Sequence, residues 1–246
     1  ANLAQAEQRF SVVEWRGGLL CGGLLFAGYG LQTAGLRLTT ASKSAFITGL
    51  YIVLVPLLGS LVQRSVPRLA EVGGAVLATA GTVLLTAGGP AGSRDLALNA
   101  GDLLTAGCAA AFAAHLLAVE RYSRRMDYER LSLYQVAGVA GLSWLAAGSL
   151  ETPRIQWSQA VVFALAATAL LATALSFLLY TWAQRHTSAT RAALIFALEP
   201  VFAGLMAWVV SGEEWGAAAL SGAALILAGI VLVELKPGRP PAHPED

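Results

Sequence analysis

Long apolar segments separated by short polar breaks dominate this sequence. Crossing the hydrocarbon core of a bilayer takes about 20 residues of helix, and eight windows of about that size follow one another along the chain. We therefore predict an all-α polytopic membrane protein with eight transmembrane helices in this chain. The predicted helices are Gly17 to Leu36, Ser44 to Val62, Leu69 to Leu85, Gly101 to Glu120, Leu131 to Ala147, Gln159 to Ala183, Ala192 to Val210 and Gly216 to Leu235.

The lysines and arginines of the breaks predict an orientation. Successive breaks between transmembrane helices lie on opposite sides of the membrane. Together with the chain ends, the breaks on one side hold twelve basic residues, and those on the other side hold four. Cytoplasmic loops of membrane proteins carry the excess of Lys and Arg. Both ends of this chain are therefore predicted to be cytoplasmic, in a multi-pass protein of the cell membrane, for which we expect the bacterial inner membrane.

Composition agrees with a membrane protein and excludes several other classes. Apolar residues make up 56% of the chain and charged residues 13%, and the mean hydropathy is +0.63. Sixteen basic against fifteen acidic residues argue against a nucleic-acid-binding surface. The sequence contains no G-x-S-x-G, H-E-x-x-H, P-loop or C-x-x-C motif, so we predict neither an enzyme nor a metal or cofactor site.

An internal repeat indicates the architecture. A shift of 148 residues places Gly74 to Leu85 on Gly222 to Val233, with seven of twelve residues identical. The same shift places RLTTASK, which starts at Arg37, on RHTSATR, which starts at Arg185. The first three predicted helices then match the last three. The partners of the fourth and fifth would lie before residue 1, so we expect this chain to be part of a longer protein.

Two halves of five helices each would enter the membrane from opposite sides, because five is odd. Such inverted repeats are common among secondary transporters, whose substrate site lies between the halves near the bilayer midplane. The predicted fold is therefore ten helices in two inverted five-helix repeats. Residues 1–88 would be the last three helices of the first repeat, residues 101–235 the whole second repeat, and residues 236–246 a disordered cytoplasmic tail.

Three stretches resemble the EamA-type transporters of the drug/metabolite transporter superfamily. They are RLTTASKSAFITGLYIVLVPLL, GDLLTAGCAAAFAAHLLAVERYS and RHTSATRAALIFALEPVFAGLMAWVVSGEEWGAAALSGAALILAGIVLVEL. The resemblance runs from about Arg16 to Leu235 and implies a central cavity that moves small metabolites, amino-acid-like or drug-like, outward across the membrane. The rival hypothesis is a membrane-embedded enzyme or signalling module acting on lipid or lipid-linked substrates. The partners left open are a coupling proton and a second copy of the chain.

Glu199 is the leading candidate for a functional residue. It is the only acid deep inside an apolar run, and Pro200 follows it directly. Because an ionised carboxylate is costly in hydrocarbon, such a residue is by default a functional-site hypothesis. Two interpretations stand. Glu199 either contacts substrate or a proton in the cavity, or it satisfies the backbone carbonyl freed at the proline.

Several other polar residues within the apolar runs are candidates for lining the cavity. His115 is either a substrate donor or proton relay, or a packing histidine with its hydrogen bonds satisfied. Gln32, Tyr51, Tyr180 and Trp182 are further candidates, although Tyr180 and Trp182 also fit an aromatic belt at the membrane surface.

Two prolines and two basic residues complete the candidate set. Pro56 and Pro200 are either hinges or static kinks. Lys43 and Arg191 begin the helices that carry these prolines, where they would either draw an anionic group toward the cavity mouth or reach to the interface.

Overall fold

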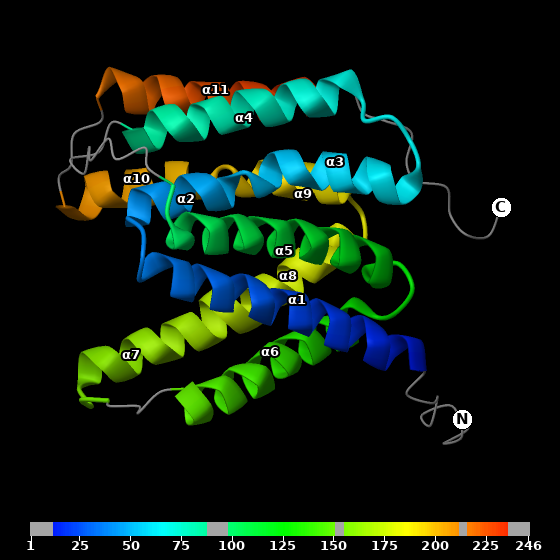
Figure 1. Cartoon of the computed structure of the whole chain (residues 1–246), viewed down its shortest axis with the longest axis vertical. Coiled ribbons are helices and arrows are strands. Elements are labelled where there is room, and N and C mark those ends of the chain that lie inside the picture. The colour runs from blue at the N-terminus through cyan, green and yellow to red at the C-terminus, as the bar shows by residue number, and fades with distance from the viewer. Residues whose placement is uncertain (1–11, 88–97, 151–154, 212–215, 236–246) are drawn as a thin grey trace.

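The computed structural model describes residues 12–87, 98–150, 155–211 and 216–235. Every element in these ranges is a helix, and the helices lie in layers with their axes roughly along one direction (Figure 1). The elements are α1 (Val12–Leu36), α2 (Ala41–Gly49), α3 (Tyr51–Gln63), α4 (Leu69–Ala87), α5 (Ala100–Ser123), α6 (Tyr128–Leu150), α7 (Gln159–Ala167), the π-helix η2 (Thr168–Leu175), α8 (Ser176–Gln184), α9 (Ala189–Phe196), α10 (Glu199–Ser211) and α11 (Ala217–Glu234).

The helices have the length and composition of membrane spans. Within the described residues, seven helical segments are long and apolar enough to cross a bilayer. The remaining predicted span, Leu69–Leu85 in α4, is apolar but shorter. The prediction of an all-α polytopic membrane protein is confirmed. The polar break at 88–97 and the expected tail at 236–246 lie outside the described residues.

The outer surface of the bundle is strongly apolar. Leu103, Trp144, Phe163 and Val209 are each at least 69% exposed. Exposing apolar surface to water costs about 25 cal/mol per Å², so a soluble protein rarely shows so much of it. Lipid tails remove this cost, and these side chains fit a lipid-facing position.

The helices pack closely where small residues meet. Gly74 and Gly81 of α4 face Gly229 and Gly222 of α11, so the two helices run antiparallel. A Cβ built on Gly81 would lie 2.5 Å from the carbonyl oxygen of Gly222, which leaves room for hydrogen only. Small residues at such contacts are the usual means of close helix approach in bilayers. The 148-residue shift places Gly74 on Gly222 and Gly81 on Gly229, so the two glycine contacts are related to each other. This is the relation expected from a pseudo-two-fold axis between α4 and α11.

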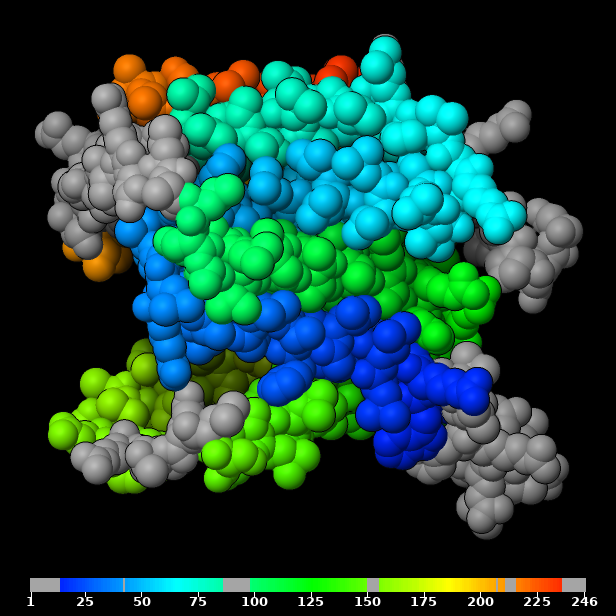
Figure 2. Space-filling model, in the orientation of Figure 1, coloured from blue at the N-terminus to red at the C-terminus, as the bar shows by residue number. Residues whose placement is uncertain are grey.

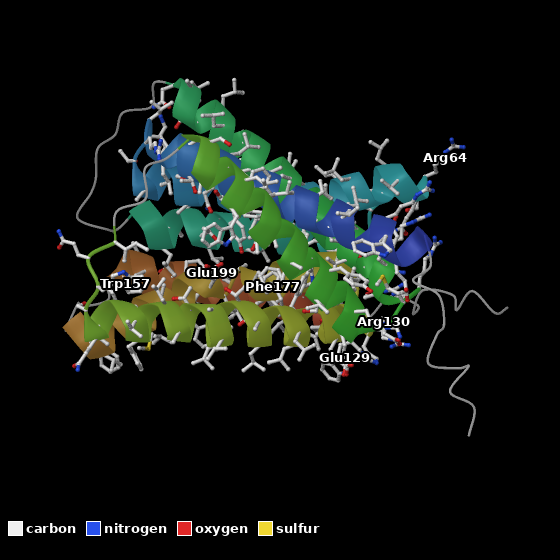
Figure 3. All side chains as sticks on the ribbon, turned by 90° about the horizontal axis from the view of Figure 1, so that it is seen from below. Arg64, Glu129, Arg130, Trp157, Phe177 and Glu199 are labelled. Carbon is white, nitrogen blue, oxygen red and sulfur yellow. The ribbon has the colours of Figure 1, made fainter. Side chains whose placement is uncertain are left out.

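Among the described residues, the two ends of the bundle differ in their number of basic residues. We call the end at which α1 begins and α11 ends the basic end (Figure 1). Arg64, Glu129 and Arg130 lie at this end, and Trp157 lies toward the opposite one (Figure 3). Between the ends, α1, α5, α3 and α4 lie side by side and fill one face of the molecule (Figure 2). Along the direction of the helix axes, Glu199 and Phe177 lie near the middle, between the two ends (Figure 3).

Candidate functional site

Two helices of the bundle are interrupted at positions related by the repeat. The first divides into α2 and α3 around Leu50, and the second into α9 and α10 around Ala197 and Leu198. The 148-residue shift places Leu50 on Leu198. Discontinuous membrane helices free backbone groups at their breaks, which is tolerated where protein or a cavity surrounds them. The breaks therefore point to the region between the two halves.

The start of each interrupted helix is built in the same way. Thr40 caps α2 by accepting from the Lys43 N–H at 3.3 Å, and Ser188 caps α9 by accepting from the Arg191 N–H at 3.3 Å. Capping by a hydroxyl satisfies one of the unpaired donors of the first turn. Thr40 and Ser188 are partners under the shift, so the repeat extends to hydrogen bonds as well as residue types.

Glu199 is the first residue of α10, and Pro200 is the second. Proline is tolerated there because the first turn has no helical acceptor for its missing N–H. Two backbone hydrogen bonds connect the half-helices across the break. The Leu198 N–H donates to the Ile195 carbonyl at 3.0 Å, and the Phe202 N–H donates to the Leu198 carbonyl at 2.9 Å. A carboxylate in a first helical turn is stabilised by the helix dipole.

A cavity of about 610 Å³ lies beside both breaks. This volume is within the range of pockets for drug-sized ligands, about 300–1,000 Å³. Four residues from the first half line it together with their partners under the shift. These pairs are Tyr29 with Phe177, Gln32 with Tyr180, Thr48 with Phe196, and Tyr51 with Glu199. The cavity therefore lies where the two halves face each other.

Aromatic rings form much of the cavity wall. Tyr180 lies 5.4 Å from Phe196 and 6.3 Å from Phe177, measured between ring centroids. On another part of the wall, Tyr29 and Phe112 meet edge to face at 5.5 Å. Such edge-to-face and tilted contacts are favourable for aromatic pairs. The cavity thus has rigid, apolar sides with hydroxyl groups from tyrosine.

A buried chain of hydrogen bonds holds His115 at the cavity. The Thr181 hydroxyl donates to the Phe177 carbonyl at 2.6 Å, so its oxygen accepts from the Gln135 amide N–H at 2.9 Å. This turns Gln135 Oε1 toward His115 Nε2, 2.9 Å away. A carbonyl oxygen only accepts, so Nε2 carries a hydrogen and donates it. Gln135 therefore sets the ring orientation of His115.

Five of the predicted lining residues come together at this cavity. They are Glu199, Tyr51, His115, Gln32 and Tyr180. Trp182 does not join them. Its side chain is 50% exposed, and its ring lies 5.2 Å from that of His186. Tyr180 precedes Trp182 by two residues, and side chains two apart on a helix point in different directions. Of these two residues, Tyr180 lines the cavity.

Neither of the predicted prolines lines this cavity. Pro56 is buried inside α3, six residues beyond the break at Leu50, and lines a second cavity of about 570 Å³. Pro200 is in the first turn of α10 and lines neither cavity. In the first half, the interruption of the helix therefore falls at Gly49 and Leu50 rather than at the proline.

The two basic candidates are paired with acids. Lys43 Nζ lies 2.6 Å from the carboxylate of Asp102, which is 3% exposed. The same carboxylate accepts from the Thr39 hydroxyl at 2.7 Å. Arg191 Nε lies 3.5 Å from the carboxylate of Glu234. Neither residue lines the 610 Å³ cavity, and Arg191 lines the 570 Å³ one.

An apolar cluster separates the two cavities. Its buried members include Val55, Leu116 and Ala193. Tyr180 packs against this cluster from the larger cavity, and Leu117 packs against it from the smaller one. The smaller cavity also takes in residues of the basic end, so the cluster lies between that end and the larger cavity.

Sequence reasoning missed several cavity residues. Tyr29 and Phe177 are partners under the shift, and applying the shift to Gln32 and Tyr51 would have indicated that whole faces of the repeated helices correspond. The π-helix that precedes Phe177 has no obvious sequence signal. Gln135 was a polar residue in an apolar run, which is the signal that had identified His115. Among the described residues, no group of three or more His, Cys, Asp or Glu is placed to hold a metal ion.

Comparisons with known proteins agree with these features. The model of the EamA-like transporter family matches residues 3–87 and 99–235. An "Uncharacterized transporter" of Archaeoglobus fulgidus is 34% identical over 223 residues, which are 91% of this chain and 70% of that protein. A solved crystal structure has the same fold, with a TM-score of 0.79 and 22% sequence identity, over 95% of this chain and 82% of the other.

Proposed function

Since this chain belongs to the EamA-like transporter family, we propose that it acts as a secondary carrier that exports small metabolites, amino-acid-like or drug-like, by alternating access. One observation carries the proposal. The 610 Å³ cavity is lined by four pairs of residues that the 148-residue shift relates, beside the breaks of two corresponding helices. A site shared by two inverted halves is the arrangement expected of carriers that expose it to each side in turn.

The arrangement of the packed regions supports alternating access. The apolar cluster around Leu116 separates the larger cavity from the basic end. In the proposed cycle this cluster opens, and the opposite end closes, when the halves rock about their contact. The antiparallel contact between α4 and α11 is a suitable pivot, because its close backbone packing resists separation.

The orientation follows from the same proposal. The basic end faces the cytoplasm of the bacterial inner membrane, because cytoplasmic loops carry the excess of Lys and Arg. The loop between α5 and α6 at this end contains Arg124 and Arg125. Residues 1–88 and 101–235 then belong to the two inverted repeats.

Glu199 is the proposed contact for substrate or for a coupling proton. It lies at the cavity, at the start of a half-helix and near the middle of the bundle (Figure 3). A carboxylate in such a place changes the free energy of a bound cation or proton strongly, because the surrounding dielectric is low.

Reconstitution of the full chain into proteoliposomes tests the carrier function. Efflux of labelled amino acids and drug-like amines should exceed that from protein-free vesicles and saturate with concentration. Glu199→Gln should lower it at least roughly tenfold, whereas Glu129→Gln should leave it unchanged, because Glu129 lies at the basic end (Figure 3). A lack of saturable flux for every compound, or full flux in Glu199→Gln, would contradict the proposal.

A further inference from the structure

The charged side chains that line the cavity are acidic only. Glu199 is the one carboxylate among the described residues that line it, and none of those residues is Lys or Arg. His115 also lines the cavity, but its hydrogen-bond partner is the neutral amide of Gln135 rather than an acid. Glu199 is exposed, and none of the ion pairs among the described residues involves it. A bound cation would supply the missing partner of Glu199.

The two basic residues in the first turns of α2 and α9 do not alter this balance. Lys43 of α2 and Arg191 of α9 each lie beside a carboxylate, that of Asp102 at 2.6 Å and that of Glu234 at 3.5 Å. The cavity therefore offers an anion no free positive charge from these two residues, and Glu199 would repel it.

The aromatic wall indicates the shape of the ligand. Seven Phe and Tyr rings line the cavity, and on the half that also supplies Glu199 the ring of Tyr180 contacts those of Phe177 and Phe196. The faces of such rings attract a cation within about 6 Å of the centroid, and they stack with aromatic ligands. A flat apolar body with a positive group fits both features.

We propose that this cavity selects organic cations that carry an aromatic or bulky apolar body, with Glu199 as the counter-charge and the rings around Tyr180 as the apolar wall. This inference rests on the proposed carrier function only for its transport step. The binding preference belongs to the cavity and can be measured without transport.

Equilibrium binding to the purified full chain in detergent provides the test. The probe is tritiated benzyltrimethylammonium, with neopentylbenzene as the uncharged analogue of the same shape and phenylacetate as the anionic competitor. Saturable binding is expected, with displacement by unlabelled cation and at least roughly tenfold weaker displacement by the other two, since the lost interaction is that of a full charge.

Variants assign the selectivity to named groups. Glu199→Gln should weaken binding of the cation at least roughly tenfold, while Glu199→Asp should retain the preference for the cation over neopentylbenzene. Phe177→Leu keeps an apolar side chain but removes a ring, so binding should weaken about threefold to tenfold. Glu129→Gln is the matched control and should bind as the unchanged protein does. Size-exclusion profiles establish that each variant remains folded.

The outcomes separate this inference from the carrier function. Equal displacement by phenylacetate or neopentylbenzene, no saturable binding of the cation, or unchanged binding by Glu199→Gln would overturn the cation preference. If the chain transports an anionic or neutral metabolite in vesicles while failing these tests, the carrier function stands and the cation inference falls. If the cation binds selectively but no compound is transported, the cation inference stands and the carrier function falls.

Discussion

Tyr51 and Glu199 occupy the same position in the two halves of this protein. Each is the first residue of the half-helix that follows a break, the two are related by the 148-residue shift, and both line the same cavity. The backbone at this position is therefore repeated, but the chemistry is not. One half supplies a carboxylate and the other a phenol.

This asymmetry predicts unequal effects of substitution at the two positions. Glu199→Gln should lower the initial rate of saturable efflux from proteoliposomes at least roughly tenfold, because it removes the charge from a site of low dielectric. Tyr51→Phe should lower it no more than a few-fold, because a neutral hydrogen bond contributes only about 0.5–1.5 kcal/mol. Equal losses at the two positions would contradict the assignment of the charge-dependent role to Glu199.

The contact between α4 and α11 predicts a sharp difference between two glycines. Gly81→Ala should lower stability by about 1–3 kcal/mol, as overpacking typically does, because its new Cβ would meet the carbonyl of Gly222 at 2.5 Å. Thermal unfolding in detergent, followed by circular dichroism, measures the change.

Gly23→Ala is the matched control for this experiment. Gly23 is also inside a helix, and a Cβ there meets nothing within 4 Å. Alanine is the better helix former by about 1 kcal/mol, so this variant should be as stable as the unchanged protein or more so. Equal melting temperatures for Gly81→Ala and Gly23→Ala would show that the close approach of α4 and α11 is absent.

Gln135 is predicted to act through His115. Gln135→Leu removes the acceptor of the His115 Nε2–H and the donor to Thr181. Leaving a buried polar group unpaired costs about 1–3 kcal/mol, so stability should fall and the affinity for the cationic probe should change with it. Gln159→Leu, at an exposed position at the start of α7, is the control and should change neither quantity. Normal stability and affinity in Gln135→Leu would contradict this positioning role.

The Lys43 and Asp102 pair is predicted to join the two halves at the end opposite the basic end. Lys43→Met leaves the nearly buried Asp102 carboxylate without its charge partner. Removing one partner of the pair leaves the other charge uncompensated, so stability should fall, though by less than for a fully buried pair because Lys43 is partly exposed. Thermal unfolding should show the loss. Lys43→Arg should recover most of it, and no difference between Met and Arg at this position would argue against the ion pair.

The repeat in the sequence contains more information about the site than any single residue does, although we did not use it to predict the lining residues. The shift that aligns Gly74 with Gly222 also relates Tyr29 to Phe177 and Gln32 to Tyr180, and all four of these residues line the cavity. A repeated sequence folds to a repeated backbone, so residues that face inward in one half have partners that face inward in the other.

By itself, the sequence determined the class of protein, the positions of the apolar helices and the correspondence of its two parts. The class of protein and the helix positions follow from the length of the apolar segments. The correspondence of the two parts follows from the sequence identity between them. Neither requires knowledge of how the helices pack. It also singled out Glu199, because a carboxylate inside an apolar run is costly wherever the helix lies.

Only the tertiary structure decided which face of each helix points inward. In water the polar face of a helix identifies the outside, but in a bilayer both the interior and the lipid-facing surface are apolar. Tyr180 and Trp182 therefore look equivalent in sequence, yet their side chains point about 200° apart around the helix, and only Tyr180 lines the cavity. The partners of polar groups were decided in the same way. Gln135 reaches His115, and Asp102 reaches Lys43, because packing brings α6 and α2 against α5.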